Sequence, residues 1–535
     1  MLTKVYSASI QGIDAFPVTI ETFGEKGALF SIVGMPDTAV KESQQRMVSA
    51  VNHSGVTFPH RRTIINLAPA DVKKEGAAFD LPMAIGVLSA HEIIPSEHLG
   101  DYMIMGELSL DGSVLPVRGV LPMAIKAREM GFKRLIVPEE NVTEAAVVNK
   151  IEVYGVRNLS EAIALISEAS DLKPTVIDTR KIFASQAECF DLDFSEVKGQ
   201  ESVKRAFEVA CSGGHNILMV GPPGAGKSMM AKRLPTILPP LSLGEALETT
   251  KIHSVAGKLS KGSMLMTRRP FRTPHHTVSP VALVGGGANP MPGEISLAHN
   301  GVLFLDEFPE FPRQVLEVMR QPIEDRVITV SRAKYTVDYP ASFMLVASMN
   351  PCPCGYHGHP TRKCTCLPNQ VSKYMNKISG PLMDRIDIQV EIEPVEFDDM
   401  ASRAPAESSA AIRSRVMAAR EIQQTRFKGL PGIHCNAQMS GRQLRQFAWP
   451  DAEGLKKLKD RMTKLNMSAR AFDRILRVAR TSADLESALN LPSRESEAYA
   501  DALAAAVSAP VLSRHIAEAI GYRALDRPSS FAIAF

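Results

Sequence analysis

The feature that constrains this chain most is the octet Gly-Pro-Pro-Gly-Ala-Gly-Lys-Ser at residues 221–228. It fits the pattern GxxxxGK[ST] at every fixed position, follows the strand-like run Asn216 to Val220 and precedes a helical run. Glycines between a buried strand and a helix let backbone N–H groups curl around phosphate oxygens, and the helix N-terminus adds positive potential. An α/β P-loop domain that binds a nucleotide is therefore expected.

Each position of the loop has an expected task. Lys227 is expected to reach the β- and γ-phosphate oxygens of ATP, and the Ser228 hydroxyl to ligate Mg²⁺. The expected nucleotide-binding residues are Gly221, Pro222, Pro223, Gly224, Ala225, Gly226, Lys227, Ser228 and, further along the chain, Asp306.

Two later strand patterns supply polar groups for hydrolysis. The apolar run Val302 to Leu305 ends in Asp306 and Glu307, which predicts a Mg²⁺ ligand followed by a general base that polarises the attacking water. The next apolar run, 343–348, leads to Asn350, whose amide is expected to orient the water and sense the γ-phosphate. A simple Asn-Pro turn is the alternative for Asn350.

Length and composition indicate the number of domains and the general class of protein. A chain of 535 residues suggests roughly two to four domains, and 45% hydrophobic with 22% charged residues is typical of globular proteins. No apolar run approaches a membrane span and the start has no signal-peptide core, which favours a cytoplasmic protein without a membrane partner. A formal charge of +3 means that any nucleic-acid surface must be local.

Periodicity divides the chain into four parts. Residues 1–170 alternate β-rich runs (27–33, 63–67, 103–105 and 134–137) with helical patterns, which predicts an α+β or α/β domain. Residues 171–190 are expected to be a linker, 191–395 an α/β ATPase core, and 396–535 a helical domain rich in Ala, Leu, Arg and Glu.

Several long, unusual strings give the chain a clear resemblance to a known family. They are NLAPADVKKEGAAFDLP (66–82), RPFRTPHHT (269–277), GGGANPMPGEISLAHNGVLFLDE (285–307), CPCG (352–355) and ISGPLMDRID (378–387). The chain resembles the YifB/ComM branch of the magnesium-chelatase-like AAA+ ATPases over nearly its whole length. The resemblance implies an AAA+ core, a Lon-protease-like N-terminal domain and a C-terminal helical lid.

The resemblance also assigns arginines that act on the nucleotide. It implies that Arg385, in Asp-Arg-Ile-Asp, is an arginine finger for the ATP of a neighbouring subunit, with a structural ion pair to Asp384 or Asp387 as the alternative. It places Arg470 at the sensor-2 position, where it should touch the nucleotide. Arg474 competes for that role, and Arg477 and Arg480 are expected on a solvated helix face.

The same resemblance implies that the N-terminal domain is related to a peptidase but lacks its catalytic residues. Ala78 stands where the resemblance would put the serine nucleophile, and Leu121 where it would put the partner lysine. An assembly or ligand-docking module is expected; a protease with a displaced dyad, such as another serine with Lys126, is the alternative.

Two segments are candidates for binding DNA. Residues 251–293 contain no Asp or Glu, and their basic residues are Lys251, Lys258, Lys261, Arg268, Arg269 and Arg272. The run 327–339 has two β-rich arms around a basic tip and predicts a hairpin whose Arg332 and Lys334 contact phosphates. By resemblance its position matches a pore-lining hairpin of AAA+ helicases; a solvated tip without a ligand is the alternative.

A cysteine cluster follows Asn350 directly. Cys352, Cys354, Cys364 and Cys366 have a C-x-C-x₉-C-x-C spacing that predicts a structural Zn²⁺ site, with His357 or His359 able to replace one thiolate. The expected role is to pin the Asn350 loop to the segment that leads to Arg385. Free thiols and a disulfide are the alternatives.

Together these features predict an ATP-driven oligomeric motor, expected to be a homo-hexamer because a finger that acts in trans needs neighbours around a ring. The resemblance implies single-stranded or branched DNA as substrate, in helicase or branch-migration work during recombination and integration of incoming DNA, with recombination proteins as further expected partners. The alternatives are a protein-remodelling or metal-insertion ATPase, like the magnesium-chelatase motor subunit, and a nucleotide-gated scaffold with little turnover.

Overall fold

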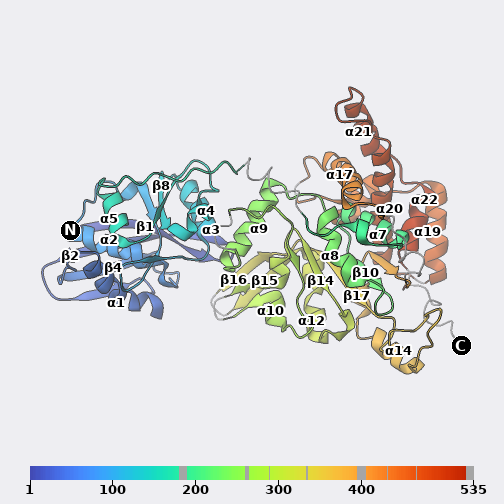
Figure 1. The fold of residues 1–535 in the computed structure, drawn as a ribbon, viewed down its shortest axis with the longest axis horizontal. Helices are drawn as coiled ribbons and strands as arrows, with labels where there is room; N and C mark the ends of the chain where they lie inside the picture. The colour runs from blue at the N-terminus through green and yellow to red at the C-terminus, as the bar shows by residue number, and fades with distance from the viewer. Residues whose placement is uncertain are drawn as a thin grey trace.

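The computed structural model describes residues 1–179, 190–259, 264–287, 290–332, 335–394, 405–430, 432–465, 467–523 and 525. Residues 180–189 of the expected linker, and the expected DNA contacts Lys261 and Lys334, lie outside the described residues. Figure 1 shows three regions in chain order, with the N-terminal domain at one end, the ATPase core in the middle and the C-terminal helices at the other end.

The N-terminal domain is built on a seven-stranded mixed sheet with the order β3-β4-β2-β1-β5-β8-β9. The strands are β1 (Leu2–Gln11), β2 (Asp14–Glu25), β3 (Phe30–Val33), β4 (Arg62–Ala68), β5 (Tyr102–Ile104), β8 (Arg134–Pro138) and β9 (Glu152–Val156). The four strand-like runs expected in this region are confirmed as β3, β4, β5 and β8. The long β1–β2 hairpin and β9 were not predicted.

Helices cover this sheet, and they are α1 (Thr38–His53), α2 (Asp80–Ala90), α3 (Val120–Glu129), α4 (Val142–Ala145) and α5 (Leu159–Ile166). Helix α2 is buried along its whole length, as its apolar sequence requires. Gly86 lets α2 lie close to β2, because a Cβ there would come within 2.7 Å of the Thr22 hydroxyl. The domain therefore has its own packed core.

The ATPase core is a five-stranded parallel sheet with the order β11-β14-β17-β10-β18. The strands are β10 (Ile217–Val220), β11 (Phe271–Arg272), β14 (Val302–Leu305), β17 (Met344–Met349) and β18 (Ile388–Glu391). Ile217 and Met219 pack into one hydrophobic core and Leu218 and Val220 into another, because successive side chains of a strand point to opposite faces. A sheet covered on both faces is the expected α/β architecture, and it is confirmed.

The helices of the core follow the strands in crossover order. They are α7 (Glu201–Gly213), α8 (Lys227–Ile237), α9 (Leu243–Val255), α10 (Pro280–Val284), α11 (Glu294–Leu297), α12 (Arg313–Val318), α13 (Arg320–Asp325), α14 (Pro368–Met375) and α15 (Gly380–Met383). The expected hairpin is confirmed as β15 (Val327–Arg332) and β16 (Tyr335–Pro340). A second, smaller ribbon of β12 (Gly285–Gly286) and β13 (Met291–Pro292) was not predicted, and the Tyr339 hydroxyl donates to the Pro290 carbonyl at 2.7 Å to join the two.

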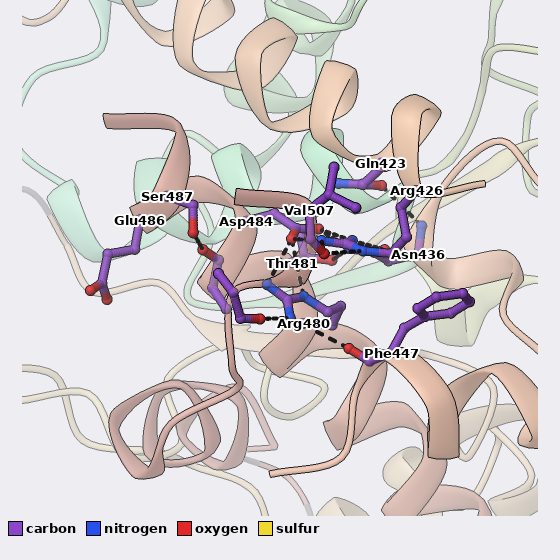
Figure 2. Close-up of polar contacts among 12 residues, drawn as sticks. Gln423, Arg426, Asn436, Phe447, Arg480, Thr481, Asp484, Glu486, Ser487 and Val507 are labelled. Atoms are coloured by element: carbon purple, nitrogen blue, oxygen red, sulfur yellow. Dashed lines mark hydrogen bonds and ion pairs between the residues drawn. The ribbon is translucent and has the colours of Figure 1, made fainter. Parts of the chain in front are cut away.

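The C-terminal region is helical, as expected. Its helices are α17 (Ser409–Arg426), α18 (Gly441–Phe447), α19 (Ala452–Leu465), α20 (Ala469–Leu489), α21 (Tyr499–Ser508) and α22 (Ser513–Gly521). Figure 2 shows a buried polar cluster that holds α17 to α20: both Nη atoms of Arg426 donate to Asp484, at 2.8 and 2.6 Å, and Arg480 Nε donates to it at 3.0 Å. The prediction that Arg480 lies on a solvated face is wrong, since its side chain is 2% exposed.

The N-terminal domain packs directly on the core through α3, α4 and α9. The Ser254 hydroxyl donates to the buried Glu144 carboxylate, and Lys251 forms an ion pair with Asp14 at 2.5 Å. Burial raises the pKa of Glu144 despite this hydrogen bond. Among the helices of the described residues, none combines the length and the apolar character that a bilayer crossing requires.

Candidate nucleotide-hydrolysis site

The phosphate loop joins β10 to α8 at the carboxyl edge of the core sheet. Gly224 and Gly226 have φ values of +81° and +85°, in the left-handed region that favours glycine, and Gly226 is the N-cap of α8. At Gly221 a Cβ would lie 2.6 Å from the Ile392 carbonyl oxygen, so the loop also needs glycine for packing. The expected strand, loop and helix are thus in place, with the helix N-terminus facing the loop.

The Lys227 ammonium is held at the centre of this loop. It donates to the carbonyl oxygens of Gly221 at 2.7 Å and Pro222 at 2.8 Å, and to Asn350 Oδ1 at 3.1 Å. Burial lowers its pKa, and the nearby Asp306 carboxylate opposes that shift. The lysine and Asn350, 123 positions apart in sequence, therefore meet in the fold.

A hydroxyl and a carboxylate meet beside the lysine. Ser228 Oγ donates to Asp306 Oδ2 at 2.6 Å, and the Ser348 hydroxyl donates to Asp306 Oδ1. Oxygen ligands of this kind suit Mg²⁺, with the remaining positions left to water and phosphate oxygens. Sequence reasoning missed Ser348; its place in β17, two residues before Asn350, was the signal that could have found it.

Glu307 follows on the same edge of the sheet. It has φ +52°, and its carboxylate lies 3.8 Å from the His276 imidazole, with the side chain 61% exposed. The His276 ring packs at 4.1 Å from that of His275 and meets Phe311 edge-on. A solvent-facing carboxylate next to the Mg²⁺ ligands is suited to take a proton from water.

The four cysteines of the cluster gather at one point. Their Sγ atoms all lie within 4.8 Å of one another, with 3.3 Å between Cys352 and Cys354, 3.7 Å between Cys352 and Cys364, and 3.5 Å between Cys354 and Cys364. Zn–S bonds of about 2.3 Å in a tetrahedron require about 3.8 Å between sulfur atoms, so the donor set fits zinc. Burial acts to raise the pKa of Cys354, but hydrogen bonds from the Thr365 and Tyr356 backbones lower it to about 5.

The loop that carries the four cysteines (residues 352–366) also contacts the phosphate loop. Gly355 has φ +83°, and a Cβ there would lie 2.5 Å from Cδ of Pro223 in the phosphate loop. Tyr374, on α14 after the last cysteine, hydrogen-bonds the backbone of Asn350, and burial raises its pKa to about 12. The loop from Asn350 to α14 therefore touches both the sensor and the phosphate loop.

Arg385 is held away from the phosphate loop of its own chain. Its guanidinium forms an ion pair with Glu324 and donates to the Pro381 carbonyl at 2.7 Å, and it lines an open surface groove. Its alternative pairing with Asp384 or Asp387 is wrong, because Glu324 is the partner. The side chain is 7% exposed, so it must leave Glu324 to reach a phosphate.

Arg470 and Arg474 lie at the amino end of the core sheet. With Arg477 they line a cavity of about 280 Å³ that also includes Asn216, the residue before β10. Arg477 donates to the Met439 carbonyl at 3.0 and 2.7 Å and is not on a solvated face as expected. The length of β10 separates this cavity from the phosphate loop of the same chain, and the expected contact of Arg470 with nucleotide stays a prediction.

Three basic residues of the acid-free segment, Lys251, Arg269 and Arg272, pair with carboxylates from outside it. Arg269 binds Glu245 at 3.1 Å and the carbonyls of Pro239 and Asn300 at 2.7 Å, with its side chain 13% exposed. Arg272 makes a two-point pair with Glu294 at 2.7 and 2.8 Å. Both guanidinium groups are thus paired within the fold, and their contact with DNA stays a prediction.

The remaining expected DNA contacts have different surroundings. Arg268 lies over the Phe190 ring at 5.3 Å, and Lys258 is exposed near the end of α9. Arg332 ends β15 at the tip of the hairpin. The hairpin packs closely against the N-terminal domain at Gly12. A Cβ at that position would lie only 2.6 Å from Val337 Cγ1.

A cavity of about 740 Å³ lies where the N-terminal domain faces the core. Ala77 and Ala78 line it on one side, and Met291 and Val337 of the two hairpins on the other. Leu121 is fully buried, and Lys126 pairs with Glu129 at 3.1 Å, so neither supplies a base at Ala78. The arrangement agrees with a domain that lacks the peptidase dyad.

Comparison with family models covers all three regions. Magnesium chelatase, subunit ChlI, matches residues 193–400; subunit ChlI of Mg-chelatase matches residues 20–141; and the C-terminal model of that subunit matches residues 406–523.

Two relatives match nearly the whole chain, and a third matches about a fifth of it. The uncharacterized protein YifB of Escherichia coli (strain K12) is 40% identical over 533 residues, covering 98% of both chains. The competence protein ComM of Haemophilus influenzae is 37% identical over 529 residues, again 98% of both. Lon protease 2 of Bacillus subtilis is 30% identical over 118 residues, which is 21% of each chain.

Proposed function

Because the chain belongs to the YifB/ComM family of magnesium-chelatase-like AAA+ proteins, we propose that it is an ATP hydrolase that works as an oligomeric DNA motor. The observation that carries the hydrolase assignment is the meeting of four groups at one edge of the sheet. Lys227 binds Asn350 at 3.1 Å and Ser228 binds Asp306 at 2.6 Å, with Glu307 next in the chain. These groups come from three parallel strand ends and need the fold to assemble.

Each group has a defined task when ATP binds. Lys227 exchanges the Gly221 and Pro222 carbonyls for β- and γ-phosphate oxygens, and the amides of the loop surround the phosphates. Ser228 and Asp306 would hold Mg²⁺, and the bound ion would supply charge neutralisation at the phosphates. Glu307 takes the proton of the attacking water, and Asn350 orients that water.

The arginines act between subunits in this proposal. Arg385 and Arg470 lie near the amino end of β10, whereas the phosphate loop begins at its carboxyl end, about 13 Å away for four residues. A neighbouring chain brings them to a nucleotide, and a closed homo-hexamer gives every subunit one such neighbour. Arg385 leaves Glu324 and donates to the developing charge on the γ-phosphate.

Subunit mixing tests this arrangement. Lys227→Ala removes ATP binding but keeps the arginines, and Arg385→Ala keeps the pocket but removes the finger. Each variant alone should hydrolyse ATP poorly, and a mixture should recover activity where an intact pocket meets an intact finger. Absence of recovery at every mixing ratio would contradict the role of Arg385 in trans.

DNA is the proposed substrate, in single-stranded or branched form. The support is the family resemblance, the competence protein among the relatives, and a basic hairpin tip at Arg332 and Lys334. We propose that the protein acts in the cytoplasm during recombination and integration of incoming DNA, beside recombination proteins. Phosphate contacts of this kind are independent of base sequence and weaken with salt.

A metal-insertion or protein-remodelling motor is the second candidate, favoured by the magnesium-chelatase family models. The two candidates differ in what stimulates ATP hydrolysis. DNA does so in the first, and a protein or chelatase partner in the second.

The cysteine cluster is proposed to bind one structural Zn²⁺ through Cys352, Cys354, Cys364 and Cys366. The sulfur separations fit a tetrahedral site, and four thiolates leave no position for a substrate water. Gly355 packs on Pro223, so the zinc site would also stabilise the phosphate loop.

A further inference from the structure

Three segments meet around one buried carboxylate at the amino end of the core sheet. Asp387 is 1% exposed and follows Arg385 by two residues. Its Oδ1 accepts from Arg474 Nη1 at 2.9 Å, and its Oδ2 accepts from the backbone N–H of Asn216 at 3.0 Å. Asp387 therefore ties the finger segment to helix α20 and to the start of β10, the strand that leads into the phosphate loop.

Asn216 extends this junction to the sensor strand. Its Nδ2 donates to the Arg385 carbonyl at 3.2 Å, and its Oδ1 accepts from the backbone N–H of Leu345 in β17 at 2.9 Å. The backbone of the finger residue is thus fixed to both of the strands that carry the nucleotide-contacting loops.

His215 makes a second connection to α20. It is fully buried, and its Nε2 lies 2.8 Å from the Thr481 hydroxyl, while its Nδ1 lies 3.6 Å from Asp387 Oδ2. Thr481 accepts from Asn436 Nδ2 at 3.0 Å, which leads into the buried cluster of Figure 2. Arg474 and Thr481 are two helical turns apart, so α20 is held at two points along its length.

Arg474 is the arginine that forms a direct ion pair with Asp387 at the junction. Burial acts to raise the pKa of Asp387, but Arg474, His215 and Arg477 together hold it well below its usual range. Burial lowers the pKa of His215, which favours its neutral form. A buried ionised carboxylate that loses its cation is costly, so the pair with Arg474 fixes where the helix lies.

We infer that Asp387 is a positioning residue for hydrolysis between subunits, which holds Arg385 and Arg470 as one unit for the ATP of the neighbouring chain. Arg470 lies one helical turn before Arg474, and Arg385 two residues before Asp387, so the carboxylate sets their relative position. This inference rests on the proposed function, in which both arginines act in trans. A displacement of about 1 Å in such groups can lower a rate about 10²-fold.

Asp387→Asn tests the inference, because the amide keeps the shape and removes the charge that holds Arg474. Binding of a fluorescent ATP analogue should stay within about twofold of the unaltered protein, since the phosphate loop is intact. Hydrolysis should fall by about 10- to 100-fold. Mixing with Lys227→Ala should restore activity, because the Asp387→Asn pocket then receives well-placed arginines from its neighbour.

Two controls separate positioning from a general loss of stability. A mixture of Asp387→Asn with Arg385→Ala should not recover, since both partners have intact pockets and defective arginines. Asp80→Asn removes another fully buried carboxylate charge, paired with Arg46 in the N-terminal domain at 2.6 Å. It should lower the melting temperature without producing a defect that Lys227→Ala rescues.

The outcomes are distinguishable. If Arg385→Ala recovers with Lys227→Ala but Asp387→Asn does not, the inference is overturned and the proposed function stands. If Arg385→Ala itself never recovers, the trans role fails and the inference falls with it. Should Asp387→Asn not fold, Arg474→Gln must show the same rescue pattern, and normal hydrolysis by Arg474→Gln overturns the inference.

Discussion

At the residue scale, Glu307 is the residue to which we assign the chemical step. Its carboxylate is exposed beside His276, and Asp306 rather than Glu307 faces Ser228. The two acids thus have separate surroundings, which supports separate roles as base and Mg²⁺ ligand. The sequence pattern of two acids after a buried strand predicts this division of roles, and it stays a prediction.

Changing Glu307 to Gln should stop hydrolysis and preserve ATP binding and assembly, because the amide keeps the shape and cannot take a proton. The expected decrease in turnover is about 10²–10⁴-fold. Phosphate release and binding of a fluorescent ATP analogue, measured on the same preparation, check it. Lys227→Ala is the matched control and should weaken binding itself; near-normal turnover by Glu307→Gln would contradict the assignment.

The surroundings of other residues depend on tertiary contacts, which a single sequence does not show. Ser348 looks like one more small residue in a buried strand, and only the fold places its hydroxyl on Asp306. Arg269 and Arg272 belong to a stretch without acids, yet Glu245 and Glu294 reach them from outside that stretch. Local charge alone therefore does not show that these two arginines are paired within the fold.

At the element scale, the cysteine loop and the β15–β16 hairpin were both predicted from spacing and alternation. The four thiols lie close together, as their spacing in the sequence predicts. It did not predict that Gly355 packs on Pro223, because that contact joins two loops more than a hundred residues apart.

Protein purified without added metal should contain about one zinc per chain. Cys364→Ser should lose that metal, lower the melting temperature and weaken ATP binding, because the loop that braces Pro223 loosens. Elemental analysis, thermal melting and nucleotide titration check the three effects. Cys435→Ser, which changes a buried cysteine outside the cluster, should keep its zinc, and fully stable metal-free protein would reject the site.

Replacing Arg332 and Lys334 together with Ala should reduce DNA affinity and leave basal ATP hydrolysis nearly intact. Two lost phosphate contacts should lower the slope of log affinity against log salt by about 2. Titrations at several salt concentrations measure both quantities. Lys457→Ala on α19, where the lysine pairs with Glu453 at 2.8 Å, is the control and should change neither; unchanged binding by the double variant would move the grip elsewhere.

At the scale of the whole molecule, the sequence predicted the regions but not how they join. The turn between β1 and β2 reaches the core, where Ile13 packs with the core residues and Asp14 pairs with Lys251. This turn lies in a stretch of sequence that gave no clear strand signal. The expected domain boundaries stay predictions, whereas the order of an α+β domain, a parallel core and a helical region is confirmed.

The hairpin proposed to bind DNA packs against the N-terminal domain at Gly12 and Ile13, a contact that sequence comparison alone does not indicate.

The central claim is that ATP hydrolysis by this chain is coupled to DNA. The most direct measurement is the rate of phosphate release with Mg²⁺ at low salt, without DNA, with single-stranded DNA and with forked DNA, using Glu307→Gln as the blank. The account predicts that DNA binds and raises the rate, and that added salt reverses the increase. Steady hydrolysis that neither DNA form changes, together with no DNA binding at low salt, would contradict it and favour a motor that acts on protein or metal.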